Sequence, residues 1–367
     1  MHLYIHVPFC GRRCSYCDFA IAVRKVTPTA AFVGAMRAEW QRWQQELGGR
    51  AAPIETLYFG GGTPSRLEGD AIAELIAMVQ RAAPLAAGAE VTLETNPDDV
   101  TPDRAAAWVT AGVNRISLGV QSHDPAVLTW MHRSHRAEQV PPAVQMLKAA
   151  GLGNVSMDLI FALPEVLERD WARDLELTLA LDPAHLSLYG LTVEPHTPLA
   201  RWTARGEALP ARDERYAAEF LAADAAMTSA GFVHYEVSNA GRPGFESRHN
   251  RAYWSGAEYV GLGPSAHSFI AGERRWNARE WADYVARLDR GESVVAGREQ
   301  IGTDAGRLER IYLGLRTSTG VPVALVPGEA LAAWVRAGWA VTNGATVRLL
   351  PEGWLRLDAL VGAIAHS

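Results

Sequence analysis

The chain has 367 residues, a net charge of −6 at pH 7 and a hydrophobic content of 48%. This length exceeds an ordinary single domain, and the acidic balance argues against a nucleic-acid-binding protein, which usually has a basic surface. No apolar run approaches the roughly 18 residues that a membrane span needs, so any membrane contact is expected to be peripheral. The first residues, MHLYIHVPFC, lack the basic start and apolar core of a signal peptide, and we expect a cytoplasmic protein.

Short runs of β-forming residues alternate with helical patterns over the first 200 residues. The expected strands are 3–8, 56–61, 90–96, 113–121, 155–163 and 185–193. Between them, apolar residues recur three or four positions apart, as in residues 29–47, which is typical of amphipathic helices. Six successive β–α units predict a parallel sheet with right-handed crossovers. A polar residue or a glycine cluster follows almost every strand, so we expect a partial (β/α)6 TIM-like barrel in an α/β fold rather than a flat doubly wound sheet.

The alternation weakens after about residue 200. Residues 211–231 predict one more amphipathic helix, and the following segment is dense in glycine, aromatic residues and histidine, which indicates a structured functional loop region. Nearer the C-terminus, helices precede two β-type runs joined by Asn343–Gly344, a hairpin turn. We therefore expect a barrel over 1–235, a connecting region over 236–290 and a small winged-helix-like α+β domain over 291–367.

All three cysteines of the chain, Cys10, Cys14 and Cys17, lie within eight residues. An odd number of cysteines without an export signal argues against a disulfide framework. A structural zinc site needs four ligands, which His6 or Asp18 would have to complete. Electron-transfer iron–sulfur clusters normally use four cysteines, whereas three thiolates leave one iron of a 4Fe–4S cluster open to an exchangeable ligand.

Two arginines, Arg12 and Arg13, stand inside this cysteine motif. Nearby cations favour the thiolate over the thiol. We therefore expect both arginines to help keep the cysteines deprotonated and to reduce the negative charge of a cluster.

The spacing Cys-x3-Cys-x2-Cys after a first strand, with the aromatic Tyr16 before the last cysteine, resembles the signature of the radical S-adenosylmethionine (SAM) superfamily. That resemblance implies a barrel of radical SAM type in which the open iron is chelated by SAM. The cluster would pass SAM one electron, and homolysis would give a 5′-deoxyadenosyl radical. The runs YIHVPFC, YFGGGTPS, LETNP, GVNRISLGVQS and MDLIFALP are similar to the coproporphyrinogen oxidase-like branch of the superfamily.

This resemblance implies a set of residues that contact SAM or line the cavity beside it. They are Tyr4, Tyr16, Gly61, Gly62, Thr63, Glu94, Gln121, Arg133 and Asp158. Glycine would allow close backbone approach to a ligand, Glu94 could accept hydrogen bonds from ribose hydroxyls, and Arg133 could pair with a carboxylate. Each residue also has a structural alternative: Glu94 or Asp158 could cap a turn, and Arg133 in MHRSHR could lie on a solvated helix face.

Two features differ from the oxygen-independent coproporphyrinogen III oxidases. Those enzymes carry a further cysteine where this chain has Phe19, and they extend well beyond the nine residues that precede Cys10 here. In both features this chain resembles the sister group, the HemW-type haem chaperones.

The same group has a His-Asn-x-x-Tyr-Trp motif, which stands here as His249, Asn250, Tyr253 and Trp254. Histidine is a common axial ligand of haem iron, an amide can orient an imidazole, and aromatic side chains can pack against a porphyrin. His267, in GLGPSAHSF, is a second and weaker candidate for haem ligation. Without the resemblance, such a His–aromatic stretch more often belongs to a packed core.

The leading hypothesis is a haem carrier that binds one 4Fe–4S cluster, SAM and haem, and that passes haem to acceptor proteins. The enzyme alternatives are oxidative decarboxylation of a porphyrinogen and another radical SAM reaction on a tetrapyrrole. The hypothesis implies a haem acceptor and an electron donor as partners, and no nucleic acid. The sequence leaves a homodimer open and names neither the acceptor nor the donor.

Overall fold

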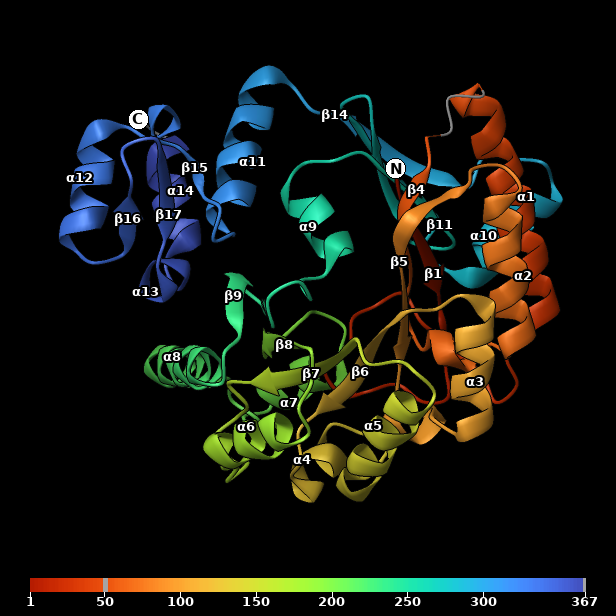
Figure 1. The fold of residues 1–367 in the computed structure, drawn as a ribbon, viewed down its shortest axis with the longest axis horizontal. Coiled ribbons are helices and arrows are strands. Elements are labelled where there is room, and N and C mark those ends of the chain that lie inside the picture. The colour runs from red at the N-terminus through yellow and green to blue at the C-terminus, as the bar shows by residue number, and fades with distance from the viewer. Residues whose placement is uncertain (49–51, 366–367) are drawn as a thin grey trace.

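The computed structural model describes residues 1–48 and 52–365, and a twelve-stranded sheet forms the centre of this part of the chain (Figure 1). Six neighbouring strands are parallel and follow one another in chain order. They are β1 (His2–Val7), β4 (Ile54–Gly61), β5 (Leu85–Thr95), β6 (Arg115–Gln121), β7 (Val155–Phe161) and β8 (His185–Gly190). The prediction of a partial (β/α)6 barrel is confirmed.

Helices cover the outer face of this barrel (Figure 1). They are α1 (Thr29–Leu47), α2 (Gly69–Gln80), α3 (Pro102–Ala111), α5 (Val140–Ala149), α6 (Trp171–Ala180) and α8 (Asp213–Ser229). Two short helices, α4 (Pro125–Trp130) and α7 (Pro198–Ala204), lie beside the loop that follows β1, where Ser15 is hydrogen-bonded to the backbone of Met131 and of Leu199. The apolar stripe of α1 is buried at Phe32, Met36 and Trp40, because residues three or four apart share one helix face. The hydroxyl of Thr101 accepts a hydrogen bond from the N–H of Arg104 and caps α3.

The sheet continues beyond both edges of the barrel. At one edge, β10 (Asn239–Gly241) pairs with β8, and β9 (Val233–Glu236) pairs with β10, both antiparallel. At the other edge, β11 (Tyr259–Leu262) runs parallel to β1 and is followed by antiparallel β12 (His267–Ile270), β13 (Glu273–Asn277) and β14 (Val295–Gln300).

The segment 236–290, expected to be a loop region, therefore supplies strands to both edges of the sheet. These strands are short and rich in glycine, arginine and histidine, so they lack the alternation that marks a strand in sequence. The division of the chain into 1–235, 236–290 and 291–367 stays a prediction, and β14 of the last range belongs to the large sheet.

A buried carboxyl group ties the added strands to the barrel. Glu39 of α1 accepts hydrogen bonds from the N–H of Gly263 at 2.7 Å, from the amide of Asn277 at 2.6 Å and from the hydroxyl of Tyr284. Tyr284 lies on α10 (Trp281–Asp289), which packs against α1. Burial raises the pKa of Glu39 to about 7, and the three donors offset part of that effect.

The C-terminal part contains a small three-stranded antiparallel sheet beside helices (Figure 1). Its elements are α11 (Thr303–Leu315), β15 (Val321–Pro322), α12 (Gly328–Arg336), β16 (Ala340–Thr342), β17 (Thr346–Leu349), α13 (Pro351–Trp354) and α14 (Leu357–Ala365). The Asn343–Gly344 turn is present: the Asn343 side chain accepts from the N–H of Thr346 at 2.9 Å, and Gly344 has a φ of 86°. Within residues 1–48 and 52–365, no helix has the length and apolar character needed to cross a membrane.

Candidate functional site

The three cysteines lie on the loop that leaves the carboxyl end of β1. The short strands β2 (Phe9–Cys10) and β3 (Ala22–Val23) pair at the base of this loop, where the N–H of Arg24 donates to the carbonyl of Cys10 at 2.9 Å. Cys10, Cys14 and Cys17 are free thiols, and all three line one cavity of about 680 Å³ at the mouth of the barrel. We call this the barrel-mouth cavity.

Most of the residues expected around SAM also line the barrel-mouth cavity. They are Tyr16, Gly61, Gly62, Thr63, Glu94, Gln121, Arg133 and Asp158. Tyr4 is the exception, because its side chain lines a different cavity, described below. The carboxyl ends of β1, β4, β5, β6 and β7 thus bring together residues that are up to 148 positions apart, from Cys10 to Asp158.

Burial governs the chemistry of the free thiols. It raises the pKa of Cys10, and it raises the pKa of Cys17 to about 11. The hydroxyl of Thr63 donates to the Cys10 sulfur at 3.4 Å, and the guanidinium of Arg133 donates to the Cys14 sulfur at 3.6 Å. The cations that lower the pKa of Cys10 are Arg133 and Arg66. At Cys10, these two residues and not the expected Arg12 and Arg13 favour the thiolate.

The glycine run at the end of β4 packs against the cysteine loop. Gly61 has a φ of 113°, which favours glycine, and the N–H of Gly62 donates to the carbonyl of Val7 at 2.8 Å. A Cβ atom on Gly62 would lie 2.8 Å from the carbonyl of Pro8 and 3.0 Å from the sulfur of Cys10. Only a residue without a side chain lets the backbone approach the thiols this closely.

Two carboxyl groups face the barrel-mouth cavity. Glu94 accepts from the hydroxyl of Tyr58 and from the N–H of Gly61, both at 2.9 Å. Burial, with a smaller contribution from the charge of nearby Asp158, raises the pKa of Glu94 to about 7. Burial also raises the pKa of Asp158 to about 6, although the hydroxyl of Ser117 donates to it at 2.9 Å. Both carboxyl groups therefore lie inside the site and not at a turn or in a surface ion pair.

Arg133 also lies inside the site and not on a solvated helix face. Its guanidinium donates to the side-chain oxygen of Asn96 at 2.6 Å and to the carbonyl of Gly119 at 2.8 Å. A Cβ atom on Gly119 would lie 3.1 Å from this guanidinium.

Gln121 ends β6 with a φ of 67°, an uncommon conformation for a residue that is not glycine.

Several lining residues were missed by the sequence analysis, among them Arg66, Asn96, Ser117 and Tyr189. Asn96 follows Glu94 by two positions, and Ser117 precedes Gln121 by four. Since side chains two apart on a strand share one face, the period of two could have identified both residues. Nothing in the local sequence marks Arg66.

The donor set of the barrel-mouth cavity fits a 4Fe–4S cluster and SAM. In the described part of the chain, no group of three or more His, Cys, Asp or Glu side chains could hold one metal ion. A cubane cluster differs from a single ion because each thiolate binds a different iron. Around the thiols, the site has carboxylates that can accept hydrogen bonds from the hydroxyl and amino groups of SAM, and an arginine that can pair with its carboxylate. The glycine backbone lets a ligand approach closely.

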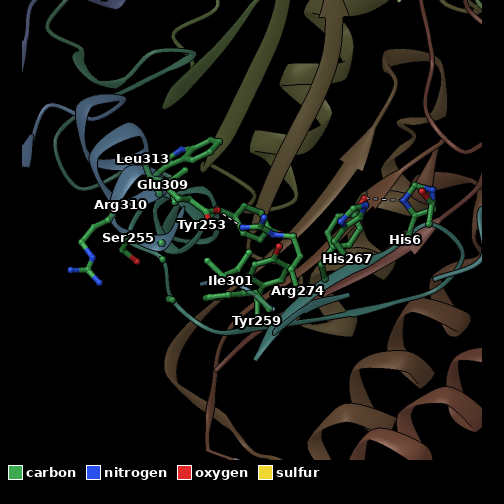
Figure 2. A pocket seen from close by; sticks show the side chains of 17 residues that line it. His6, Tyr253, Ser255, Tyr259, His267, Arg274, Ile301, Glu309, Arg310 and Leu313 are labelled. Atoms are coloured by element: carbon green, nitrogen blue, oxygen red, sulfur yellow. Dashed lines mark hydrogen bonds and ion pairs between the residues drawn. The ribbon is translucent and has the colours of Figure 1, made fainter. Parts of the chain in front are cut away.

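A second cavity, of about 720 Å³, lies beside β11, β12 and β13 (Figure 2). We call it the sheet-edge cavity. It is lined by Tyr4, His6, Tyr253, Trp254, Ser255, Gly256, Ala257, Tyr259, Ser265, His267, Phe269, Arg274, Ile301, Gly306, Glu309, Arg310 and Leu313. The hydroxyl of Tyr4 is 3.1 Å from Nδ1 of His6, so the two side chains form one wall.

The His-Asn-x-x-Tyr-Trp motif forms most of helix α9 (Arg248–Trp254), and its residues separate in space. Tyr253 and Trp254 line the sheet-edge cavity, whereas Asn250 lines neither cavity. His249 is 1% exposed and lies inside the barrel, with Nδ1 at 2.7 Å from the hydroxyl of Thr56 and Nε2 at 2.8 Å from the hydroxyl of Tyr253. Burial lowers the pKa of His249 to about 3, so this imidazole is neutral.

His267, the weaker candidate from the sequence, lines the sheet-edge cavity and is exposed. Its ring stacks on Trp276, with the ring centroids 5.9 Å apart. Burial of part of the ring lowers the pKa of His267 below 6.5.

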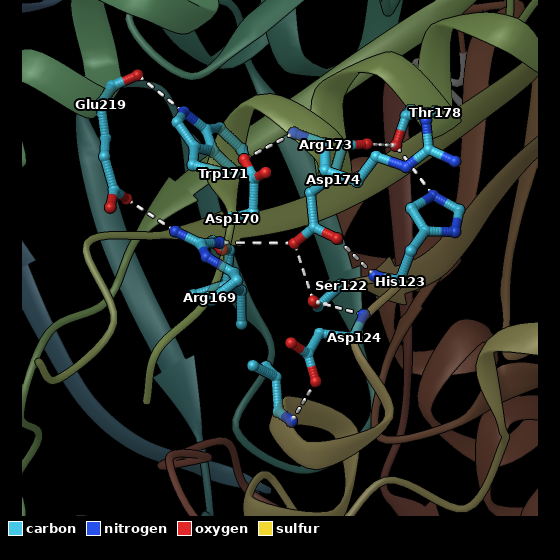
Figure 3. Close-up of polar contacts among 12 residues, drawn as sticks. Ser122, His123, Asp124, Arg169, Asp170, Trp171, Arg173, Asp174, Thr178 and Glu219 are labelled. Atoms are coloured by element: carbon cyan, nitrogen blue, oxygen red, sulfur yellow. Dashed lines mark hydrogen bonds and ion pairs between the residues drawn. The ribbon is translucent and has the colours of Figure 1, made fainter. Parts of the chain in front are cut away.

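A buried ionic network holds the loops after β6 and β7 (Figure 3). Arg169 binds Glu219 at 2.7 Å and lies 3.6 Å from Asp174, which also accepts from the hydroxyl of Ser122 at 2.7 Å and the N–H of His123 at 2.8 Å. Ser122 directly follows Gln121, so the network fixes the strand end that carries this lining residue. Breaking a buried ion pair leaves an uncompensated charge in the interior.

A partial (β/α)6 barrel with three free cysteines at the carboxyl ends of its strands defines the class of radical SAM proteins. The family model described as the radical SAM superfamily matches residues 4–178. The heme chaperone HemW of Mycobacterium tuberculosis is 37% identical over 366 residues, which cover 98% of this chain and 93% of the relative. The heme chaperone HemW of a Synechocystis strain is 35% identical over 332 residues, 88% of this chain and 80% of the relative. The chain belongs to the HemW family of the radical SAM superfamily.

The solved structure of coproporphyrinogen III oxidase (HemN) from Escherichia coli has the same fold. It superposes with a TM-score of 0.83 and covers 99% of this chain and 89% of its own. At 19% sequence identity, this likeness concerns the architecture alone.

Replacing Arg169 by methionine is expected to lower the free energy of unfolding by about 3–5 kcal/mol, because Asp174 would lose its ion-pair partner in the interior and Glu219 would keep only Arg215, at 2.8 Å. Urea denaturation followed by tryptophan fluorescence measures this change. In the matched control, Arg212→Met, an exposed ion pair with Glu165 is lost, which should cost less than about 1 kcal/mol. Equal losses in the two variants would contradict the structural role of Arg169.

Gly62→Ala is expected to disturb the cysteine loop, because the new methyl group would overlap Pro8 and the Cys10 sulfur. Overpacking costs about 1–3 kcal/mol, so SAM should bind about tenfold more weakly to the reconstituted protein, and less iron should be retained. Gly34→Ala is the control, since no atom lies within 4 Å of its added Cβ. Iron analysis and isothermal titration with SAM should give wild-type iron content and SAM affinity for this control. Wild-type values in Gly62→Ala would show that the close approach of the Gly62 backbone to the cysteine loop is not needed.

Glu94→Gln is expected to stabilise the cofactor-free protein at pH 8 relative to wild type, and less so at pH 5. The folded pKa of Glu94, about 7, lies above the ordinary 4.5, so its contribution to stability is present at low pH and is lost as the pH rises to 7. Each pKa unit corresponds to about 1.4 kcal/mol, which gives a gain of up to about 3 kcal/mol at pH 8. Urea midpoints at both pH values test this against the exposed control Glu74→Gln, and a gain of equal size at pH 5 and pH 8 would rule out titration as its cause.

Proposed function

We propose that this protein is a haem chaperone that binds haem, a 4Fe–4S cluster and SAM, and that transfers haem to acceptor proteins. The observation that carries the proposal is the extent of its similarity to a protein named heme chaperone HemW, which reaches 98% of the chain. That similarity includes the cysteine loop and both cavities. A haem acceptor, an electron donor, a homodimer and a cytoplasmic location stay predictions.

In this proposal the three cysteines hold the cluster in the barrel-mouth cavity. A cluster with one open iron supplies single electrons to SAM when both are bound. The thiolates carry negative charge, which the hydrogen bonds from Thr63 and Arg133 partly offset. Glu94 is placed to accept from SAM hydroxyl or amino groups, because its carboxylate already faces the cavity between two fixed donors.

Phe19 supports a carrier over an oxidase. It is 57% exposed and lines the barrel-mouth cavity at the position where the resemblance places a fourth cysteine in the oxidases. The side chain of phenylalanine provides neither a metal ligand nor a proton.

Anaerobic reconstitution tests the proposal directly. We expect about four irons per chain in the wild type, and few in a variant with all three cysteines replaced by alanine. Titrated haem should give a shifted Soret band and should then move to an added haem-free acceptor, such as an apo-cytochrome b fragment. Incubation with coproporphyrinogen III, SAM and a reductant should give no protoporphyrinogen. Absence of haem binding would refute the chaperone function, and turnover of coproporphyrinogen would establish the oxidase instead.

A further inference from the structure

The floor of the sheet-edge cavity is one face of the added strands. Phe269 of β12 stands opposite Tyr259 of β11 and Arg274 of β13, and His267 stands opposite Trp276. Residues that face each other across a ladder, and residues two apart on a strand, point to the same side of the sheet. Strand pairing therefore places an imidazole, three aromatic rings and a guanidinium on a single surface.

The opposite wall comes from two helices. Tyr253 and Trp254 stand at the C-terminal end of α9, and Arg310 and Leu313 are on α11 (Figure 2). The rings of Tyr253 and Tyr259 meet edge to face, with their centroids 4.6 Å apart. The cavity of about 720 Å³ lies within the range of roughly 300–1,000 Å³ that small-molecule and cofactor sites occupy.

Two histidines line this cavity, and one of them is available as a ligand. His6 is engaged through both ring nitrogens, with the hydroxyl of Tyr4 and, at 2.9 Å, the carbonyl of Ala20. The imidazole of His267 forms no hydrogen bond or ion pair with any other part of the described chain, and it stacks on Trp276. A neutral imidazole with a free nitrogen and a fixed ring is suited to bind a metal centre.

His249 does not share this availability. Both of its nitrogens are hydrogen-bonded, to Thr56 and Tyr253, and its ring stacks on Tyr58 with the centroids 4.9 Å apart. To bind iron it would have to break a buried hydrogen bond and leave the interior of the barrel. Its bond to Tyr253 instead fixes the orientation of an aromatic wall of the sheet-edge cavity.

The cavity also has a cationic rim. Arg274 binds Glu299 at 2.8 Å and Glu309, so its charge is already paired. Arg310 is exposed, and its guanidinium has no ion pair or hydrogen bond within the described residues. An unpaired guanidinium at the edge of an aromatic cavity is suited to the carboxylates of an otherwise apolar ligand.

Resting on the proposed function, we infer that haem binds in the sheet-edge cavity, with His267 as its axial ligand and Arg310 pairing with a propionate. Tyr253 and Trp254 contact the porphyrin face, and His249 acts as a positioning residue that holds Tyr253. The motif His249–Trp254 then shapes the wall of the site without supplying the bond to iron.

Haem titration of the cluster-reconstituted protein tests the axial ligand. His267→Ala should lose the Soret and electron paramagnetic resonance signature of histidine ligation, should bind haem at least about tenfold more weakly, and should regain the ligated spectrum with added imidazole. His249→Ala should keep the histidine-ligated spectrum. SAM binding and the melting temperature confirm that each variant is folded.

Iron-free protoporphyrin IX separates ligation from the shape of the cavity. His267→Ala should bind it nearly as well as the wild type, because there is no iron to bind, whereas Arg310→Ala should bind it several-fold more weakly. Arg307→Ala, an exposed arginine of α11 that does not line the cavity, is the matched control.

The possible failures have different meanings. A wild type that binds no haem refutes the proposed function itself. Haem binding that keeps its histidine signature in His267→Ala, or loses it in His249→Ala and not in His267→Ala, overturns the assignment of the axial ligand. Arg310→Ala and Arg307→Ala variants with equal protoporphyrin affinity would overturn the role of the cationic rim.

Discussion

The parallel pairing of six consecutive strands is the constraint on which the site depends. In a parallel sheet the carboxyl ends of all strands meet at one edge, so each short segment that follows a strand reaches the same space. The cysteine loop after β1, the glycines after β4, Glu94 of β5 and Asp158 of β7 converge in this way. The buried ion pairs of Arg169 with Asp174 and Glu219 then fix the loops that follow β6 and β7.

Strand β1 serves both cavities because it has a partner on each side. It pairs with β4 of the barrel and with β11 of the added sheet. His6 lines the sheet-edge cavity, and a Cβ atom on Gly61, which lines the barrel-mouth cavity, would lie 2.6 Å from the His6 ring. The proposed sites for haem and for SAM are therefore separated by a single layer of residues.

The inside of the barrel is polar, and helix α9 fills one end of it. His249 binds Thr56, and Glu90 accepts hydrogen bonds from the backbone N–H groups of Arg248 and His249 at the start of the helix. Arg115, 1% exposed, partly offsets the burial that raises the pKa of Glu94 and of Asp158, because its positive charge favours the ionised carboxylates. Burying such groups is costly unless they are paired. The packing of α9 inside the barrel thus explains why His249 of the His-Asn-x-x-Tyr-Trp motif has a structural role, with both ring nitrogens hydrogen-bonded.

The sequence by itself determined the features that depend on local periodicity and spacing. These are the six parallel strands, helix α1, the turn at Asn343 and the clustering of three thiols on one loop. Tertiary structure decided which side chains share a cavity. It placed Tyr4 beside His6 in the wall of the sheet-edge cavity, it buried His249, and it left His267 exposed in the sheet-edge cavity. The reason is physical: β11 to β14 are short, and the group joins the large sheet only through the pairing of β11 with β1, more than 250 positions earlier in the chain, so no local pattern encodes the face on which their side chains lie.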